Sequence, residues 1–198
     1  MNRYACMTLV FILSFATVAF AQVSTDNAYQ VRYTVNLNQG DSFIRIVNTG
    51  ARGGVPATPG PGGEICADVY GFAPNGQMNS CCSCLVPPDG FVSLSVWQDL
   101  LRDSSVFPTP NAMAIKLLAT VPVAGVCQAS AVNTATLAPG LASWGTTLQP
   151  SSFFISTPEV KESPFTPSTL SASELAKLAA QCTAIHGGAH SCKSCPAS

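Results

Sequence analysis

The cysteines restrict most what this chain can fold into. Nine cysteines occur in 198 residues, and only Cys6 lies within the first 21 residues, which leaves eight. An even number of cysteines in an exported chain is typical of disulfides, although spacing alone does not determine the pairing. Eight are too few to replace a hydrophobic core at this length. The sequence therefore predicts a packed domain stapled by Cys66, Cys81, Cys82, Cys84, Cys127, Cys182, Cys192 and Cys195.

The first 21 residues predict export. Arg3 gives the chain a positive start, an apolar run covers residues 9–20, and Ala19-Phe20-Ala21 has the small-x-small form of a cleavage site. The run is shorter than the roughly 20 apolar residues that a membrane-spanning helix requires. We expect residues 1–21 to be a signal peptide that is cleaved near Ala21. The mature protein is then secreted, periplasmic or held at the cell surface, with no membrane span.

Charge narrows the range of partners. The chain carries 9 Lys and Arg against 10 Asp and Glu, and charged residues make up 10% of it. No basic stripe is present, so the sequence predicts no nucleic-acid partner. The mean hydropathy of +0.30 excludes a chain that is disordered overall. Such a low charge fits either an assembling surface or a surface rich in Ser, Thr and Asn. The partner itself is unknown, and an extracellular or cell-surface ligand is compatible with these features.

Alternation of apolar and polar residues predicts an all-β domain over residues 22–168. Short strands separated by Gly and Pro turns are typical of a single β-sandwich, and an immunoglobulin-like arrangement fits the pattern. Pro- and Gly-rich residues 51–63 are expected to form a surface loop, and 149–168 an extended connector pinned by Phe153, Phe154 and Ile155. The expected strands cover residues 29–37, 42–47, 65–71, 78–86, 91–97, 112–120, 127–136 and 143–148.

Residues 169–198 predict one short C-terminal helix followed by a cysteine tail, docked on the same domain. Ser171 and Glu174 have the spacing of a capping box at a helix start. The next apolar residues recur at helical spacing, and Gly187-Gly188 ends the pattern. One face of the helix should therefore pack on the sandwich through Leu175, Leu178, Cys182 and Ile185.

Residues 73–77 predict a three-residue hairpin loop with a glycine bulge, because Pro, Asn and Gly occupy the positions that such a loop requires. If Ala73 faces Gln77, paired residue numbers sum to about 150. Cys66 then lies opposite Cys84 at a site where side chains are close. This register predicts a Cys66–Cys84 disulfide.

Two further cysteines belong to the same strand as Cys84. Side chains alternate along a strand, so Cys82 and Cys84 should point to one face and Cys81 to the other. We expect the neighbours Cys81 and Cys82 to bridge to different partners, either Cys127 or the C-terminal tail.

The C-terminal tail also carries candidate metal ligands. His186, His190, Cys192 and Cys195 are residue types that bind tetrahedral zinc, and Cys192-x-x-Cys195 has the spacing of a redox motif. Gly187 and Gly188 separate the two histidines, which argues against a shared helical face. An oxidising compartment also favours disulfides over free thiols. A metal-binding or thiol-active tail stays the alternative function.

Catalytic patterns are weak. Gly140 to Gly145 misses the Gly-x-Ser-x-Gly spacing around Ser143 by one residue, and phosphate and dinucleotide fingerprints are absent. A carboxylate pair for glycoside hydrolysis would have to come from Glu64, Asp68, Asp99 or Asp103. The sequence thus leaves enzymatic activity open but favours a non-catalytic protein, and it predicts no cofactor.

Four stretches resemble those of a group of exported, cysteine-rich β-domain proteins of soil bacteria. These stretches are Ile65 to Tyr70, Cys81 to Cys84, Trp144 to Leu148 and Cys192 to Cys195. The resemblance implies export and a cysteine-rich β domain, and it brings no activity or catalytic residue. The leading prediction is therefore an exported, non-catalytic extracellular or surface protein with a binding or structural role.

Overall fold

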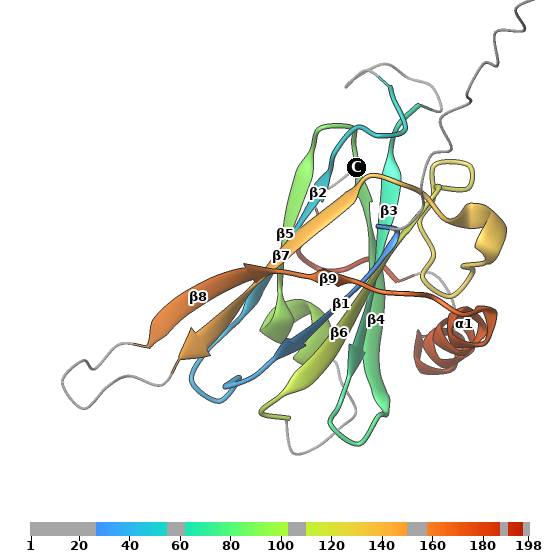
Figure 1. The fold of residues 1–198 in the computed structure, drawn as a ribbon. Helices are drawn as coiled ribbons and strands as arrows, with labels where there is room; N and C mark the ends of the chain where they lie inside the picture. Colours follow the sequence, from blue (N-terminus) through green and yellow to red (C-terminus); the bar gives the residue numbers. More distant parts are fainter. Residues whose placement is uncertain (1–26, 55–61, 103–109, 150–157, 187–189, 196–198) are drawn as a thin grey trace, which may run out of the picture.

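Two antiparallel sheets form a β-sandwich. The computed structural model describes residues 27–54, 62–102, 110–149, 158–186 and 190–195, and of His186 only the backbone. Sheet A has the order β4-β3-β6-β1-β9 and sheet B the order β5-β2-β7-β8 (Figure 1). The strands are β1 (Tyr29–Thr34), β2 (Phe43–Asn48), β3 (Ile65–Phe72), β4 (Met78–Val86), β5 (Phe91–Ser95), β6 (Met113–Thr120), β7 (Leu141–Gln149), β8 (Glu159–Pro164) and β9 (Thr166–Pro167).

The main core lies between the sheets. Alternate residues of β2 and β5 are buried, as expected for strands with one covered face, whereas every residue of β3 is buried. The core combines aliphatic residues such as Ile46, Val69 and Leu117 with the side chains of Cys82 and Cys84 from β4. The predicted fold class, an all-β sandwich with one short C-terminal helix, is confirmed. An immunoglobulin-like strand order stays a prediction.

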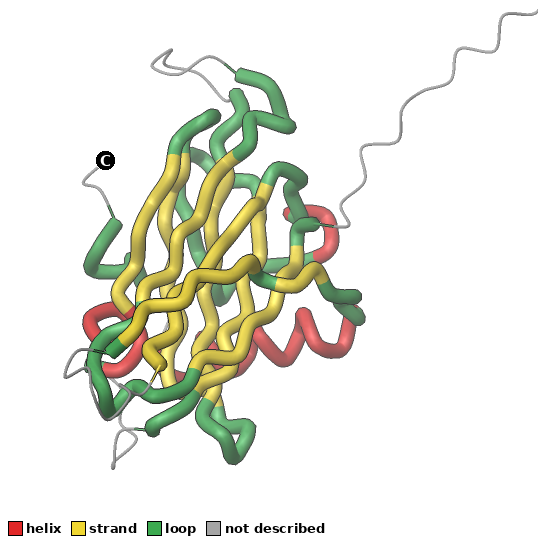
Figure 2. Tube along the Cα trace, turned by 60° about the vertical axis from the view of Figure 1, so that its left-hand side comes forward, coloured by secondary structure: helices red, strands yellow, loops and turns green. Residues whose placement is uncertain are grey.

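The outer face of sheet A is covered, which explains why β3 is buried on both faces. Helix α1 (Ala172–His186) lies beside β4, and the segment 121–138 covers the neighbouring part of the sheet (Figure 1). In Figure 2 the helical segments lie outside the packed strands. As predicted, the hydroxyl of Ser171 accepts a hydrogen bond from the Glu174 amide at the start of α1. The predicted apolar face packs on Tyr70, with Leu175, Leu178 and Cys182 buried and Ile185 partly buried.

One side of the sandwich, where β1 approaches β7 and β8, is joined by polar side chains. Arg32 donates hydrogen bonds to Ser163 and to Thr147, and burial lowers the pKa of its guanidinium. A Cβ at Gly145 would lie 2.5 Å from the Arg32 Nε, so a larger residue at this strand position would displace the Arg32 side chain from its present place. Between β8 and β9 the chain passes from sheet B to sheet A, and Phe165 turns into the core there.

The predicted hairpin loop is confirmed, but the register beyond it is wrong by one residue. The amide of Ala73 donates to the carbonyl of Gln77 at 2.9 Å, and Gly76 has a φ of 81°. Phe72 pairs with Met78, in the expected register. A β-bulge then adds one residue to β4, so Cys66 lies opposite Leu85 instead of Cys84. The bulge moves the two cysteines to opposite faces of the sheet.

Three further expectations about elements are corrected. Residues 127–136 form turns and the short 3-10 helix η2 (Thr134–Thr136), because Asn133 caps the local backbone and the bridge to β6 forms only afterwards, at Leu137. The end of the strand expected at 91–97 becomes the π-helix η1 (Val96–Leu101), since the Ser95 hydroxyl accepts from the Gln98 amide. Residues 158–167, expected as a connector, contain β8 and β9.

Part of the sequence analysis falls outside the described residues. The signal peptide over residues 1–21, the middle of the loop 51–63 and the anchor at Phe153, Phe154 and Ile155 all lie there.

Candidate functional site

Eight cysteines form four disulfides, and they join the two sides of sheet A to different segments. The expectation that Cys81 and Cys82 have different partners is confirmed, whereas the predicted Cys66–Cys84 bridge is wrong. Cys66 lies on the outer face and bonds to the covering segment, and Cys84 lies in the core. The pairs are Cys66–Cys127, Cys81–Cys182, Cys82–Cys192 and Cys84–Cys195.

The described C-terminal tail, residues 190–195, pairs with β4 at the edge of sheet A, and we call this tail the clasp. The Ser83 amide of β4 donates to the His190 carbonyl, and the Cys192 amide donates to the Ser83 carbonyl. This pairing covers an edge strand that would otherwise expose unpaired backbone groups. Asp99 of η1 adds to the clasp, because its carboxylate accepts from the amide and the hydroxyl of Ser194.

The cysteines among the candidate metal ligands are oxidised, whereas a metal site needs thiolates. The sulfurs of Cys84, Cys192 and Cys195 lie within 4.8 Å of one another, but all three are in disulfides. A disulfide sulfur is not a thiolate, so these residues would have to be reduced before they could bind a metal or act as thiols. The backbone of His190 belongs to the clasp, and the side chain of His186 lies outside the described residues.

The candidate acids occupy separate parts of the fold. Asp68 lies on the covered outer face of sheet A, and Asp99 lies in the clasp at the sheet edge. Glu64 precedes β3, where its carboxylate accepts from the Gly62 amide. Asp103 lies outside the described residues. Within the described ranges the structure therefore brings no two of these carboxylates into a shared hydrogen-bonding network.

Asp68 is the most perturbed of these acids. It has no exposed surface, and it accepts hydrogen bonds from the hydroxyls of Ser83 at 2.5 Å and Thr120 at 2.7 Å. Burial raises the pKa of Asp68 to about 7, although both hydroxyls act to lower it. Solvent and ligands do not reach this carboxyl, so the perturbed pKa marks a structural group.

A cleft of about 560 Å³ opens at one end of the sandwich, which is within the usual size of small-molecule sites. Its walls come from the loop 37–41, from Trp97 at the start of η1 and from Pro110 and Asn111 before β6. Sequence analysis missed it, because these segments are far apart in the chain and Trp97 was assigned to a strand. The presence of a tryptophan at position 97 was the one signal that the sequence offered.

Hydrogen bonds hold the cleft open in its present shape. The Asp41 carboxylate accepts from the Trp97 amide at 2.9 Å and from the Ser95 hydroxyl at 2.5 Å, which ties the loop to η1. On the opposite wall the carbonyl of Asn111 accepts from the Leu37 amide, and its side chain accepts from the Asn38 amide. The cleft is therefore organised by its own backbone before any ligand binds.

The cleft combines one aromatic ring with uncharged amide groups and the Asp41 carboxylate, whose oxygens are engaged in the hydrogen bonds of the wall. Trp97 is 43% exposed and presents an apolar ring face. Asn38, Gln39 and Asn111 supply amide groups, which both donate and accept hydrogen bonds. Among the described lining residues none is cationic. This arrangement suits a ligand that is uncharged, rich in hydroxyl groups and apolar on one side.

A second surface is the outer face of sheet B. Every second side chain of its four strands points to this face. In contrast to sheet A, no described helix lies on this face, because α1 and the segment 121–138 cover sheet A and the buried side chains of η1 join the core between the sheets. The face carries Phe91, Phe43 and Trp144 with exposed fractions of 72%, 43% and 38%. It is defined by Phe43, Arg45, Val47, Phe91, Ser93, Ala142, Trp144, Thr146, Val160 and Glu162.

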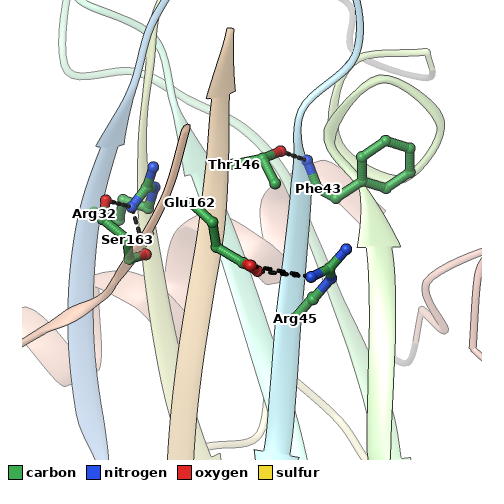
Figure 3. A network of polar contacts seen from close by, with 6 residues as sticks. All are labelled: Arg32, Phe43, Arg45, Thr146, Glu162 and Ser163. Carbon is green, nitrogen blue, oxygen red and sulfur yellow. Dashed lines mark hydrogen bonds and ion pairs between the residues drawn. The ribbon is translucent and has the colours of Figure 1, made fainter. Parts of the chain in front are cut away.

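An ion pair lies in the middle of this face. The Arg45 Nη1 donates to both carboxylate oxygens of Glu162 at 3.0 and 3.1 Å, across the intervening strand β7 (Figure 3). Thr146 on β7 accepts from the Phe43 amide at 2.7 Å. Both charged side chains are accessible, with exposed fractions of 54% and 38%. A cation and an anion thus stand side by side among aromatic residues.

Comparison of the chain with protein-family models, with curated proteins and with solved structures finds no match. Among the described residues, no helix combines the length and the apolar character that a membrane crossing requires.

Proposed function

We propose that this protein is an exported, non-catalytic binding protein that takes a neutral carbohydrate in the cleft beside Trp97. The observation that carries the proposal is the exposed indole beside amide side chains in a cleft of about 560 Å³.

Export is supported by two independent features. Residues 1–21 have the pattern of a signal peptide, and the described cysteines form four disulfides. Disulfides of this kind form and persist in oxidising compartments.

A non-catalytic role is supported by the positions of the acids. The perturbed carboxyl of Asp68 is shielded beneath the segment 121–138, and Asp99 is engaged by Ser194 and by the Ser95 amide. In the cleft itself, the oxygens of Asp41 already accept hydrogen bonds that hold the walls together. General acid and base catalysis needs a group within reach of the substrate and free to exchange a proton.

A sugar is favoured as ligand by the match of chemistries. A pyranose ring has an apolar face of C–H groups, which packs on an indole, and hydroxyls at its rim, which pair with amides. The described lining has no cation, so anionic ligands gain no charge pairing there.

The test is a fluorescence titration with neutral oligosaccharides. The chain has two tryptophans, so Trp144→Phe leaves Trp97 as the single indole reporter. Cellohexaose, chitohexaose and mannohexaose are added to this variant, and we expect one of them to shift the emission with a Kd between about 1 μM and 1 mM. Calorimetry on the unmodified chain should give the same affinity.

The control is Trp97→Ala in the unmodified chain. This variant should bind the same sugar at least about fivefold more weakly by calorimetry, since one aromatic contact is worth about 1 kcal/mol or more. Tyr33→Ala removes another exposed aromatic residue, on β1 of sheet A, and should bind normally. If none of the sugars changes the Trp97 emission up to about 10 mM, the carbohydrate proposal is wrong.

A further inference from the structure

We propose that a second copy of this chain packs on the outer face of sheet B, which makes the protein a weak, symmetric, face-to-face dimer. None of the residues that line the Trp97 cleft belongs to this face. The dimer is therefore independent of the carbohydrate proposal, and each can fail without the other.

The first argument is the contrast between the two sheets. The segment 121–138 and α1 bury the outer face of sheet A, whereas sheet B leaves Phe91 at 72% and Val160 at 60% exposure. Single exposed apolar residues need no explanation, but a contiguous group on a flat face is typical of an interaction surface. Two sheets pack face to face about 10 Å apart, so another sheet fits such a surface.

The second argument is charge complementarity. In a two-fold dimer the same patch meets itself, so a patch must be complementary to its own copy. We place the two-fold axis in the plane of the interface, at right angles to the line from Arg45 to Glu162 and through its midpoint. This axis sets each Arg45 against the partner's Glu162. The two ion pairs of the monomers then join into a network of four alternating charges.

The third argument is the position of the aromatic residues relative to that axis. By register, Trp144 lies on β7 beside Arg45, and Phe43 lies on β2 two residues before Arg45, on the same face. The two rings therefore flank the line from Arg45 to Glu162 on opposite sides, close to the axis. Each ring packs against its own counterpart in the second copy, where aromatic contacts contribute most to association.

Size and charge set the expected strength. Four strands about 4.8 Å apart and about six residues long cover roughly 400 Å² in projection. This is less than the ~800 Å² per partner of a standard interface, so the dimer belongs to the weak class. The formal net charge of −1 for the chain gives little repulsion between copies. We expect a Kd in the micromolar range.

The experiment is a charge exchange measured by analytical ultracentrifugation of the oxidised protein. Arg45→Glu leaves two anions on the face, and Glu162→Arg leaves two cations. Each variant alone should self-associate at least about tenfold more weakly, because like charges then meet across the axis. An equimolar mixture should form a heterodimer with nearly the original affinity, since both cross-axis contacts become attractive again.

The controls separate dimerisation from folding. Both variants must keep the thermal midpoint and the disulfide content of the unmodified protein. Phe43→Ser, which changes no charge, should weaken self-association, and Tyr33→Ser on sheet A should not. The proposal is wrong if the unmodified protein stays monomeric up to about 1 mM, or if the mixture associates no better than each variant alone.

Discussion

At the scale of single residues, the buried polar side chains of Asp68 and Tyr70 have particular hydrogen-bond partners. The Asp68 carboxylate accepts hydrogen bonds from two hydroxyls, and burial is the dominant influence on its pKa. Tyr70 beside it donates to the Ala129 carbonyl, and burial together with the Asp68 charge raises the pKa of its phenol. This polar group anchors the covering segment to sheet A.

The raised pKa of Asp68 predicts a pH-dependent stability. The folded-state pKa of about 7 lies above the ordinary value of 3.8, so between these values the folded protein binds more protons than the unfolded chain. The free energy of unfolding should therefore fall as the pH rises from about 4 to about 7, by up to about 4 kcal/mol. Urea denaturation at a series of pH values measures this loss.

Asp68→Asn is the matched variant. Its amide keeps one acceptor and adds one donor for the same two hydroxyls, and it does not titrate. The variant should lack the stability decrease between pH 4 and pH 7. An unchanged decrease would assign the effect to other groups.

At the scale of elements, the sandwich is closed at its two open sides by different means. Arg32 and Phe165 join β1 to β7 and β8, whereas η1 and the tail close the side where β4 and β5 lie. Asp99 connects the tail to η1, because its carboxylate accepts from the Ser95 amide as well as from Ser194. The clasp therefore depends on one carboxylate in addition to two disulfides.

Removal of this carboxylate should loosen the clasp. In Asp99→Ala the Ser194 and Ser95 amides lose a charged acceptor, which should lower the free energy of unfolding by about 2 kcal/mol. Hydrogen exchange of the Ser83 amide, which the tail protects, should become at least about tenfold faster.

Two comparisons test this interpretation of Asp99. Asp99→Asn keeps an accepting oxygen and should show an intermediate effect. Glu159→Ala removes an exposed carboxylate on the edge strand β8 and should change neither quantity. Unchanged exchange at Ser83 in Asp99→Ala would mean that the disulfides alone hold the tail.

At the scale of the whole molecule, disulfides connect the covering layers to the sandwich. The bridges span between 61 and 111 residues of sequence, so they join segments that are distant in the chain. Long loops closed by a bridge restrict the unfolded chain strongly. Cys127, Cys182, Cys192 and Cys195 bond the segment 121–138, helix α1 and the described tail to sheet A.

The oxidised state of the whole molecule can be measured by mass. Four disulfides remove two hydrogens each, so the intact protein exported to an oxidising compartment should be eight hydrogens lighter than its reduced form. Reduction should unfold it, because each native bridge contributes about 2–5 kcal/mol. Free Cys192 and Cys195 with zinc bound under native conditions would instead favour the metal-binding alternative.

The candidate site was only partly predictable from the sequence. The two faces of Cys81 and Cys82 follow from strand alternation, and the separate partners follow from the strain of joining neighbours. The Trp97 cleft has no such signature, because loop 37–41, Trp97 and Asn111 meet only in the folded chain. The exposed face of sheet B could not be recognised either, since alternation alone does not tell which sheet another element covers.

The sequence by itself determined the all-β class, most of the strands, the hairpin loop at 73–77 and the capped C-terminal helix, because these depend on local patterns and turn chemistry. The tertiary structure alone decided the disulfide pairing, because a single bulge residue in β4 shifts the register and moves Cys66 and Cys84 to opposite faces. It also decided the burial of Asp68, the clasp on β4 and the cleft. These features arise from contacts between distant segments, whose geometry depends on the packing of both sheets.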